Sequence, residues 1–178
     1  MIYVFLAPGF EEIEALATVD VLRRAGEEVL TVGVTENVIC GSHHIPVTTD
    51  TTIAQLPEEC PDVIVLPGGM PGTLNLEACT QLQKMIRTAH REGKILAAIC
   101  AAPSIFGHMG LLKDRAATCY PGFEQELIGA KYVKQKVCRD GQIITANGAG
   151  SAIEFALEIV QAIQNKEAAD RIAAAMQC

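Results

Sequence analysis

The sequence predicts an α/β protein, in which helices cover both faces of a mostly parallel sheet. Two observations support this prediction. Short, continuous apolar runs alternate along the chain with amphipathic stretches of helical period, which is typical of a parallel sheet that is buried on both faces. In addition, no linker, low-complexity tract or internal repeat interrupts the 178 residues. We therefore expect one domain that spans residues 1–178.

The first half of the chain is expected to supply three strands, a hairpin and two helices. Residues 2–7 are the first apolar strand. A helix over about 11–25 follows, because its apolar positions share one face and Gly26 provides a stop. The remaining elements expected here are strands at 29–34 and 62–66, a hairpin of 38–40 with 45–47, and a long helix over about 74–91.

The second half is expected to begin with a strand over 94–99 and a short helix that ends near Met109. Asp140-Gly141 is a typical hairpin turn, which would join strands at 132–138 and 142–145. The other elements expected are a short strand at 116–120 and two final helices, over about 151–164 and 166–176.

Composition argues against several classes of protein. The formal charge of −7 and the lack of a basic run give no support to a nucleic-acid or anionic-membrane partner. Residues 95–112 carry no charged side chain, but Pro103 and Gly107 interrupt them, so a strand, turn and helix explain them better than a membrane span. The first apolar run is too short for a signal peptide. Seven cysteines without a Cys-x-x-Cys pair are typical of reduced thiols, so we expect a soluble, cytoplasmic protein.

Cys100 stands where a buried strand is expected to turn sharply into a helix. The strand at 94–99 is apolar, the alanines Ala98 and Ala102 flank the cysteine, and Pro103 stands where a helix would begin. This is the layout of a nucleophile elbow, a strained strand-to-helix turn that lifts a side chain above the sheet. The alternative is a buried structural thiol, since free cysteines are among the most buried residues.

Glu14 lies just past the first strand, at the edge where open α/β sheets place their sites. Its spacing from Ile13 and Ala17 turns it to the inner side of the expected helix, whereas Glu11 and Glu12 can face water or support the helix dipole. A protonated carboxyl group directed at a thiolate would stabilise the charged sulfur. Ordinary acidic enrichment in the first turn of a helix is the alternative.

Gly68-Gly69 follows the strand at 62–66. Two glycines allow backbone N–H groups to approach a ligand closely, as an oxyanion hole requires, although a flexible loop would also contain them. Neither Gly-x-Gly-x-x-Gly nor Gly-x-x-x-x-Gly-Lys occurs in the chain. We therefore expect no nucleotide cofactor.

Five segments of the chain carry motifs that belong together. They lie at residues 7–14, 19–26, 62–69, 97–103 and 150–157. Each motif is weak by itself, but with all five in order the chain resembles the DJ-1/ThiJ/PfpI superfamily over nearly its whole length. The resemblance is to the branch of the parkinsonism-associated protein deglycase and its bacterial relatives.

The resemblance implies a flavodoxin-like three-layer sandwich, and a chain that assembles as a homodimer. It implies that Cys100 is the reactive cysteine and that Glu14 is its protonated carboxylic partner. The backbone N–H groups of Gly69 and Ala101 would be the oxyanion donors. No cofactor and no metal are implied.

The chain departs from the superfamily pattern at three places. Gly68 and Tyr120 are further candidates for the lining of the site, but human-like members carry a histidine at the position of Tyr120, so no general base can be assigned there. The peptidase-like branch has a histidine directly after its cysteine, where this chain has Ala101, so we do not expect a peptidase. The arginine that lines the site in close relatives is replaced around Gly41-Ser42.

The remaining histidines and cysteines give weaker signals. His43-His44 at the expected hairpin tip could bind a surface metal, but adjacent histidines point in different directions and no further ligand completes a site. Cys40 and Cys119 are possible disulfide partners for an oxidised Cys100. The sequence does not give the distances between these sulfur atoms, which decide whether a disulfide can form.

Two functions of different classes fit these residues. The first is a cofactor-free enzyme of the glyoxalase or deglycase type, acting on a small aldehyde or dicarbonyl such as methylglyoxal or on its early adducts. Cys100 would be the nucleophile and Glu14 the proton shuttle. The second is an oxidative-stress sensor or redox-regulated chaperone, in which Cys100 is oxidised to a stabilised sulfinate.

Overall fold

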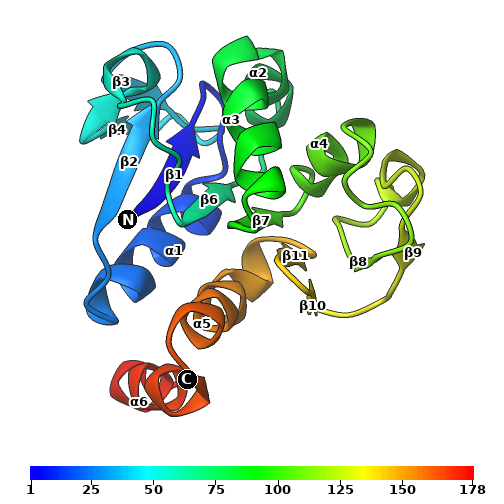
Figure 1. The fold of residues 1–178 in the computed structure, drawn as a ribbon. Coiled ribbons are helices and arrows are strands. Elements are labelled where there is room, and N and C mark those ends of the chain that lie inside the picture. The colour runs from blue at the N-terminus through cyan, green and yellow to red at the C-terminus, as the bar shows by residue number, and fades with distance from the viewer.

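The computed structural model describes all residues, 1–178. A seven-stranded sheet lies at its centre, in the order β10-β11-β7-β6-β1-β2-β5 (Figure 1). All neighbouring strands are parallel except β10, which forms an antiparallel hairpin with β11. The strands are β1 (Ile2–Leu6), β2 (Val29–Gly33), β5 (Thr51–Thr52), β6 (Val63–Leu66), β7 (Ile95–Ile99), β10 (Val137–Asp140) and β11 (Ile143–Ala146). The predicted mostly parallel sheet is confirmed.

Helices cover both faces of this sheet, as predicted. Figure 1 shows α1, α5 and α6 on one side and α2, α3 and α4 on the other. The first group is α1 (Glu12–Arg24), α5 (Ala152–Ile163) and α6 (Lys166–Met176). The second group is α2 (Gly72–Ala78), α3 (Thr80–Arg91) and α4 (Pro103–His108). Three short 3-10 helices, η1 (Ile53–Gln55), η2 (Glu124–Glu126) and η3 (Ala149–Ser151), lie in the connections.

The two layers of helices explain why the central strands are apolar throughout. Along β1, Val4 and Leu6 belong to the core beneath α1 and α5, whereas Tyr3 and Phe5 belong to the core beneath α3. Side chains alternate between the faces of a strand, so a strand that is covered on both faces needs an apolar residue at every position. None of the helices is long and apolar enough to cross a membrane.

The predicted long helix over 74–91 is wrong, because the structure has two helices there. α2 ends at Ala78 and α3 begins at Thr80. Between them Cys79 adopts an extended conformation, with φ −75° and ψ 98°, and its N–H bonds to the carbonyl of Leu76. The apolar period runs through both helices, so periodicity alone did not reveal the break.

The predicted strands around residue 132 are also partly wrong. The hairpin at Asp140-Gly141 is present, but β10 begins only at Val137. Residues 131–132 form β9 (Lys131–Tyr132), which pairs in parallel with β8 (Ala116–Ala117) in a separate small sheet. β8 is therefore shorter than the predicted strand over 116–120. Residues 133–136, of which all but Val133 are polar, separate the two sheets.

The first hairpin is confirmed, with a shift of one residue in its second strand. β3 (Val38–Cys40) pairs antiparallel with β4 (Pro46–Thr48). Its tip docks on the loop after β1, because the N–H of Gly9 donates to the carbonyl of Cys40 at 2.8 Å. The N–H of Ser42 likewise donates to the carbonyl of Phe10 at 2.8 Å. The hairpin thus braces the start of α1.

The strand order determines where a site can form. β1 has β2 on one side and β6 on the other, so the connections that leave β1 and β6 lead in opposite directions. In open α/β sheets this reversal opens a crevice at the carboxyl ends of the strands. The loop after β1, the loop after β6 and the turn after β7 meet at this edge.

Candidate active site

Cys100 occupies the strained turn that follows β7. Its φ is +64°, in the left-handed region, which costs a residue other than glycine about 1–3 kcal/mol. The turn is fixed on both sides, because the N–H of Cys100 donates to the carbonyl of Ala146 at 2.9 Å and its carbonyl accepts from the N–H of Tyr120 at 2.8 Å. α4 then begins at Pro103. These features make the turn a nucleophile elbow with Cys100 at its apex.

The loop after β6 passes against the elbow at Gly68. A Cβ atom at this position would lie 2.7 Å from the Cβ of Cys100 and 2.9 Å from Oε2 of Glu14. Gly69 has φ +90°, and a Cβ there would lie 2.5 Å from the backbone nitrogen of Glu11. Glycine is therefore required at both positions, because neighbouring atoms approach the backbone too closely for a Cβ atom. A loop that is merely flexible would not have this requirement.

Glu14 projects from the first turn of α1 into this junction. It is only 1% exposed. Its Oε2 accepts a hydrogen bond from the N–H of Gly68 at 2.8 Å, whereas Oε1 is buried and receives no hydrogen bond from the protein. One carboxyl oxygen is thus held in place, while the other is buried without a partner.

The burial of Glu14 and Cys100 makes their protons interdependent. Burial raises the pKa of Glu14 to about 7, and hydrogen bonds from the Gly68 amide and the Cys100 thiol offset only part of this effect. Burial, followed by the negative charge on Glu14, also raises the pKa of Cys100, to about 12. Two negative charges are therefore not held together here. A thiolate at Cys100 requires that Glu14 carry the proton.

Two backbone amides favour negative charge on the sulfur. The N–H groups of Ala101 and Gly69 are directed at Cys100 and lower the pKa of its thiol, against the effect of burial. One amide comes from the elbow and the other from the loop after β6. Two amides converging from different loops are the arrangement that stabilises an oxyanion next to a nucleophile.

Tyr120 lies beside the elbow, but mainly through its backbone. Its side chain is about half exposed, and its ring packs near Gly148, where an added Cβ would lie 3.3 Å from the ring. Cys119 is buried and Cys40 is exposed. The pairing of either cysteine with Cys100 stays a prediction.

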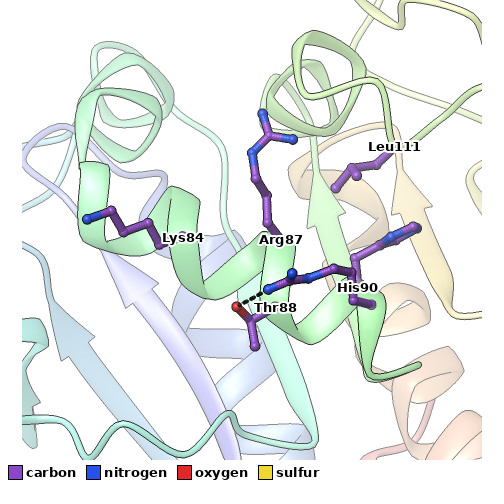
Figure 2. Close-up of a pocket in the computed structure, with 6 residues that line it drawn as sticks. Lys84, Arg87, Thr88, His90 and Leu111 are labelled. Atoms are coloured by element: carbon purple, nitrogen blue, oxygen red, sulfur yellow. Dashed lines mark hydrogen bonds between the residues drawn. The ribbon is translucent and has the colours of Figure 1, made fainter.

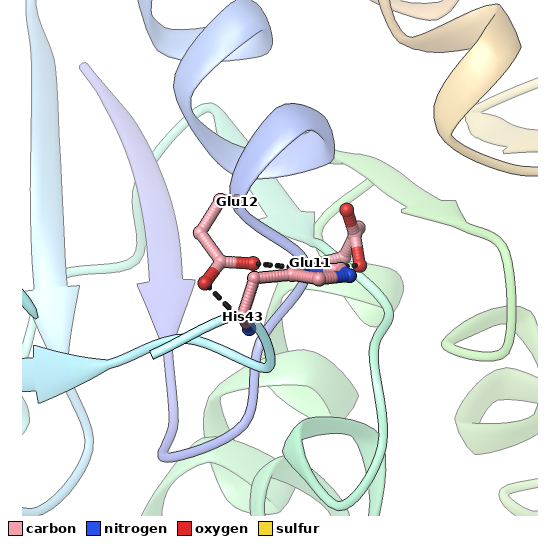
Figure 3. A group of neighbouring side chains, drawn as sticks. All are labelled: Glu11, Glu12 and His43. Atoms are coloured by element: carbon pink, nitrogen blue, oxygen red, sulfur yellow. Dashed lines mark hydrogen bonds and ion pairs between the residues drawn. The ribbon is translucent and has the colours of Figure 1, made fainter. Parts of the chain in front are cut away.

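The expectation that Glu12 faces water is wrong. Glu12 is buried, and its Oε1 accepts from the N–H of His43 at 2.8 Å while its Oε2 contacts Nδ1 of His43 at 2.9 Å (Figure 3). Burial acts to raise its pKa, but the hydrogen bonds from His43 and from backbone amides lower the pKa to about 2. The residue in the sequence that relates to this burial is Gly41. A Cβ atom there would lie 2.2 Å from Oε1 of Glu12, so only glycine leaves room for the carboxylate.

Glu11, Glu12 and His43 are the residues closest to a cation-binding arrangement. One ligand atom from each lies within 4.8 Å of the others. The hydrogen bonds among these side chains and Ser42 already use most of those atoms. His44, the other histidine of the tip, is not part of the group. The cluster therefore acts as a hydrogen-bonded brace between the hairpin and α1.

Comparisons with known proteins show which proteins this chain resembles. The model of the DJ-1/PfpI family matches residues 1–162. Protein DJ-1 homolog B of Arabidopsis thaliana is 39% identical over 167 residues, covering 92% of this chain and 38% of that protein. The Glutathione-independent glyoxalase DJR-1.2 of Caenorhabditis elegans is 35% identical over 162 residues, covering 88% and 84% of the two chains.

Solved structures agree over nearly the whole chain. The structure described as Toxoplasma gondii DJ-1, oxidized, has a TM-score of 0.95 and 37% identity, covering 99% of this chain and 97% of that chain. The crystal structure of Drosophila melanogaster DJ-1beta has a TM-score of 0.94 and 35% identity, covering 99% and 96%. The chain spans only 38% and 44% of the two Arabidopsis relatives that it matches.

The shared proton leads to a prediction for cysteine reactivity. Alkylation of Cys100 by iodoacetamide should increase as the pH rises through about 7, because deprotonation of the pair of Glu14 and Cys100 begins there and the two amides draw part of the negative charge onto the sulfur. Near neutral pH Cys100 should be labelled faster than the other six cysteines. Glu14→Gln should move the increase to higher pH, since the amide has no proton to exchange with the sulfur.

Competitive labelling read by mass spectrometry at graded pH measures this. Glu28→Gln is the matched control, because Glu28 is exposed and acts on the pKa of neither Glu14 nor Cys100, so its profile should follow the wild type. Preferential labelling of the exposed Cys40 or Cys178 at neutral pH would contradict the prediction.

Proposed function

This chain belongs to the DJ-1/PfpI family, and from this premise we propose that it is a cofactor-free, cysteine-dependent enzyme for reactive dicarbonyls, such as methylglyoxal, or their early adducts. One observation carries the proposal: Cys100 at the apex of the elbow, next to a buried carboxyl group and two converging amides. The relative named a glutathione-independent glyoxalase supports this type of chemistry.

The first step of the proposed reaction is addition of the Cys100 thiolate to the aldehyde carbon, which gives a hemithioacetal. Negative charge moves from sulfur to the former carbonyl oxygen, where the amides of Gly69 and Ala101 can stabilise it. Glu14 holds a proton at this stage and can donate it to that oxygen. The raised pKa of Glu14 suits this role, because the carboxyl group must be protonated while the sulfur is charged.

Donation of the proton leaves Glu14 as a carboxylate, which is the form that can act as a base. It would remove the proton from the former aldehyde carbon and return it to the neighbouring carbon. The hydroxyl proton passes from the first oxygen to the oxygen of the neighbouring carbon, so the first carbon is oxidised to a thioester and the second is reduced to an alcohol, with no external oxidant. Water then releases the hydroxy acid and regenerates Cys100, so methylglyoxal and one water give lactate.

Production of lactate from methylglyoxal and of glycolate from glyoxal tests the proposal. Cys100→Ser should abolish turnover, since the hydroxyl is a much weaker nucleophile at neutral pH. Glu14→Gln should lower kcat by about 10²–10⁴-fold, as is typical for a lost proton-transfer group.

Glu28→Gln is again the control and should change kcat by less than about threefold. Glu11→Gln and Glu12→Gln are not fair controls, because both residues belong to the cluster that braces the hairpin to α1. If Glu14→Gln and Glu28→Gln have equal, small effects, Glu14 is not the proton shuttle.

We propose oxidation sensing as the second candidate function of the same site. A relative of this fold is described as oxidized, and the unpaired Oε1 of Glu14 and the two amides offer partners for sulfinate oxygens. Two equivalents of peroxide would convert the thiolate to a sulfinate and two waters. Graded peroxide followed by intact-mass measurement should show a gain of two oxygens at Cys100. A loss of two hydrogens would instead indicate a disulfide with Cys119 or Cys40.

We also propose that two copies of the chain associate through α1 and α5. Ile13 is 58% exposed and Leu16 is 38% exposed on α1. Ile13 and Ile153 of α5 both line a hollow of about 360 Å³ between these helices, and its walls are mostly apolar. A second copy would cover these side chains, and it would rest on the helix that carries Glu14.

Sedimentation velocity tests this association. Leu16→Glu should convert a dimer into monomers, because it places a charge in the apolar contact. Leu74→Glu on α2, which is 53% exposed, is the matched control and should leave the dimer intact. Identical masses for the wild type and both variants would contradict the proposed contact.

A further inference from the structure

A second candidate site lies on α3, away from Cys100. An open hollow of about 500 Å³ runs along the carboxyl-terminal half of this helix. Figure 2 shows Lys84, Arg87 and His90 on successive parts of α3, with Leu111 on the segment beside it. The hollow is lined by Lys84, Arg87, Thr88, His90, Arg91 and Leu111.

The charges around this hollow are of one sign. Lys84, Arg87 and Arg91 are three and four residues apart, which places them on one face of the helix. No carboxylate lines the hollow. In a chain with a formal charge of −7, this is a local concentration of positive charge.

The three basic side chains have no ion-pair partner in the protein. Seven of the fourteen lysines and arginines form such pairs, namely Arg23, Arg24, Lys94, Arg115, Lys136, Arg139 and Lys166. Lys84, Arg87 and Arg91 are among the seven that do not. Neighbouring like charges on a helix destabilise it by roughly a few tenths of a kcal/mol. The cluster therefore does not contribute to the stability of the fold.

The helix dipole does not account for the cluster. Cations are favoured only in the last turn of a helix, which here contains His90 and Arg91. Lys84 and Arg87 lie earlier. The guanidinium groups also keep donors free, because Arg91 donates one hydrogen bond to Oγ1 of Thr88 at 3.2 Å and Arg87 makes one long contact, 3.5 Å, with the carbonyl of Met109.

His90, which lines the hollow, also carries an unsatisfied polar atom. Its Nε2 is buried and has no hydrogen-bond partner, although its carbonyl accepts from Nε2 of Gln142 at 3.0 Å. Buried polar atoms are almost always paired in native proteins. Burial and the nearby Arg115 lower the pKa of His90, so the ring is neutral and can donate or accept one further hydrogen bond.

We propose that this hollow binds a small organic phosphate, with the phosphate group between Arg87, Arg91 and Lys84. Two guanidinium groups and one ammonium group match the several oxygens of a phosphate better than the two of a single carboxylate. The inference concerns a different ligand from the substrate of Cys100.

An adjoining hollow indicates how the ligand would be oriented. It has a volume of about 360 Å³ and shares Lys84 and Thr88 with the first. Leu56 and Met85 provide apolar walls there, and Glu58 provides a carboxylate. A phosphate is repelled by Glu58, so the phosphate lies at the end with Arg87 and Arg91, and the organic part extends toward Leu56.

The position of the hollow separates it from the elbow. α3 ends at Arg91, just before β7 begins at Ile95, whereas Cys100 follows the other end of β7. Five residues of extended strand span about 16 Å. The two sites therefore lie at opposite edges of the sheet, and binding at α3 does not require an active Cys100.

Isothermal titration of the full chain with phenyl phosphate and with adenosine monophosphate tests the proposal. In about 0.1 M salt at least one should bind with a Kd below about 1 mM, and both adenosine and inorganic phosphate should bind more weakly. Amide chemical shifts in NMR spectra should change at residues 84–91 and 111. Cys100→Ser should bind as the wild type does.

Two double variants separate a site from general attraction. Arg87→Gln with Arg91→Gln should raise the Kd at least tenfold, roughly 1.4 kcal/mol of binding free energy. Lys113→Gln with Arg171→Gln removes the same charge from exposed residues that also form no ion pair, and should change the Kd less than about twofold. Equal weakening by both pairs, equal affinity for inorganic phosphate, or no binding at millimolar ligand would overturn the proposal.

Discussion

The fold keeps two acidic groups, the Cys100 thiol and the Glu14 carboxyl, side by side and out of water. Burial raises the pKa of both, and each negative charge opposes the other. The pair therefore carries one negative charge at most near neutral pH, and the position of the remaining proton decides which group is reactive. The elbow, the glycines and the two amides all affect how this proton is distributed between Cys100 and Glu14.

The sheet brings the pair together through interlocked loops. The reversal of direction at β1 and β6 places two loops at one edge, and direct backbone hydrogen bonds join them. The N–H of Glu11 donates to the carbonyl of Gly68 at 2.9 Å, and the N–H of Gly72 donates to the carbonyl of Gly9 at 3.1 Å. Added Cβ atoms at these glycines would overlap the opposing chain. A shift of either loop would move Glu14 and the Gly69 amide together.

The sequence alone predicted most of the fold and the strand-to-helix turn at Cys100, for physical reasons that differ from residue to residue. The apolar runs of the central strands and the small residues around Cys100 are local signals. The break at Cys79 and the short pairing of β8 with β9 depend on contacts between distant segments, so the hydrophobic period of the sequence does not predict them. The same holds for Glu12: its burial depends on the hairpin tip at His43, about thirty residues later. No local pattern on α1 separates Glu12 from Glu11.

Glu12 and Glu14 show how neighbouring carboxyl groups on one helix acquire opposite properties. Glu12 is surrounded by donors from the hairpin, and its pKa is held at about 2, so its charge is permanent. Glu14 receives one backbone N–H and faces a thiol, and burial raises its pKa to about 7. The number of donors that reach each carboxylate, rather than burial alone, sets the difference. A permanent charge can hold the hairpin to α1. Only a carboxyl group whose charged form is destabilised by burial can exchange a proton with Cys100. The helix thus uses one acidic residue to hold the structure and leaves the next, two positions on, free to change its charge.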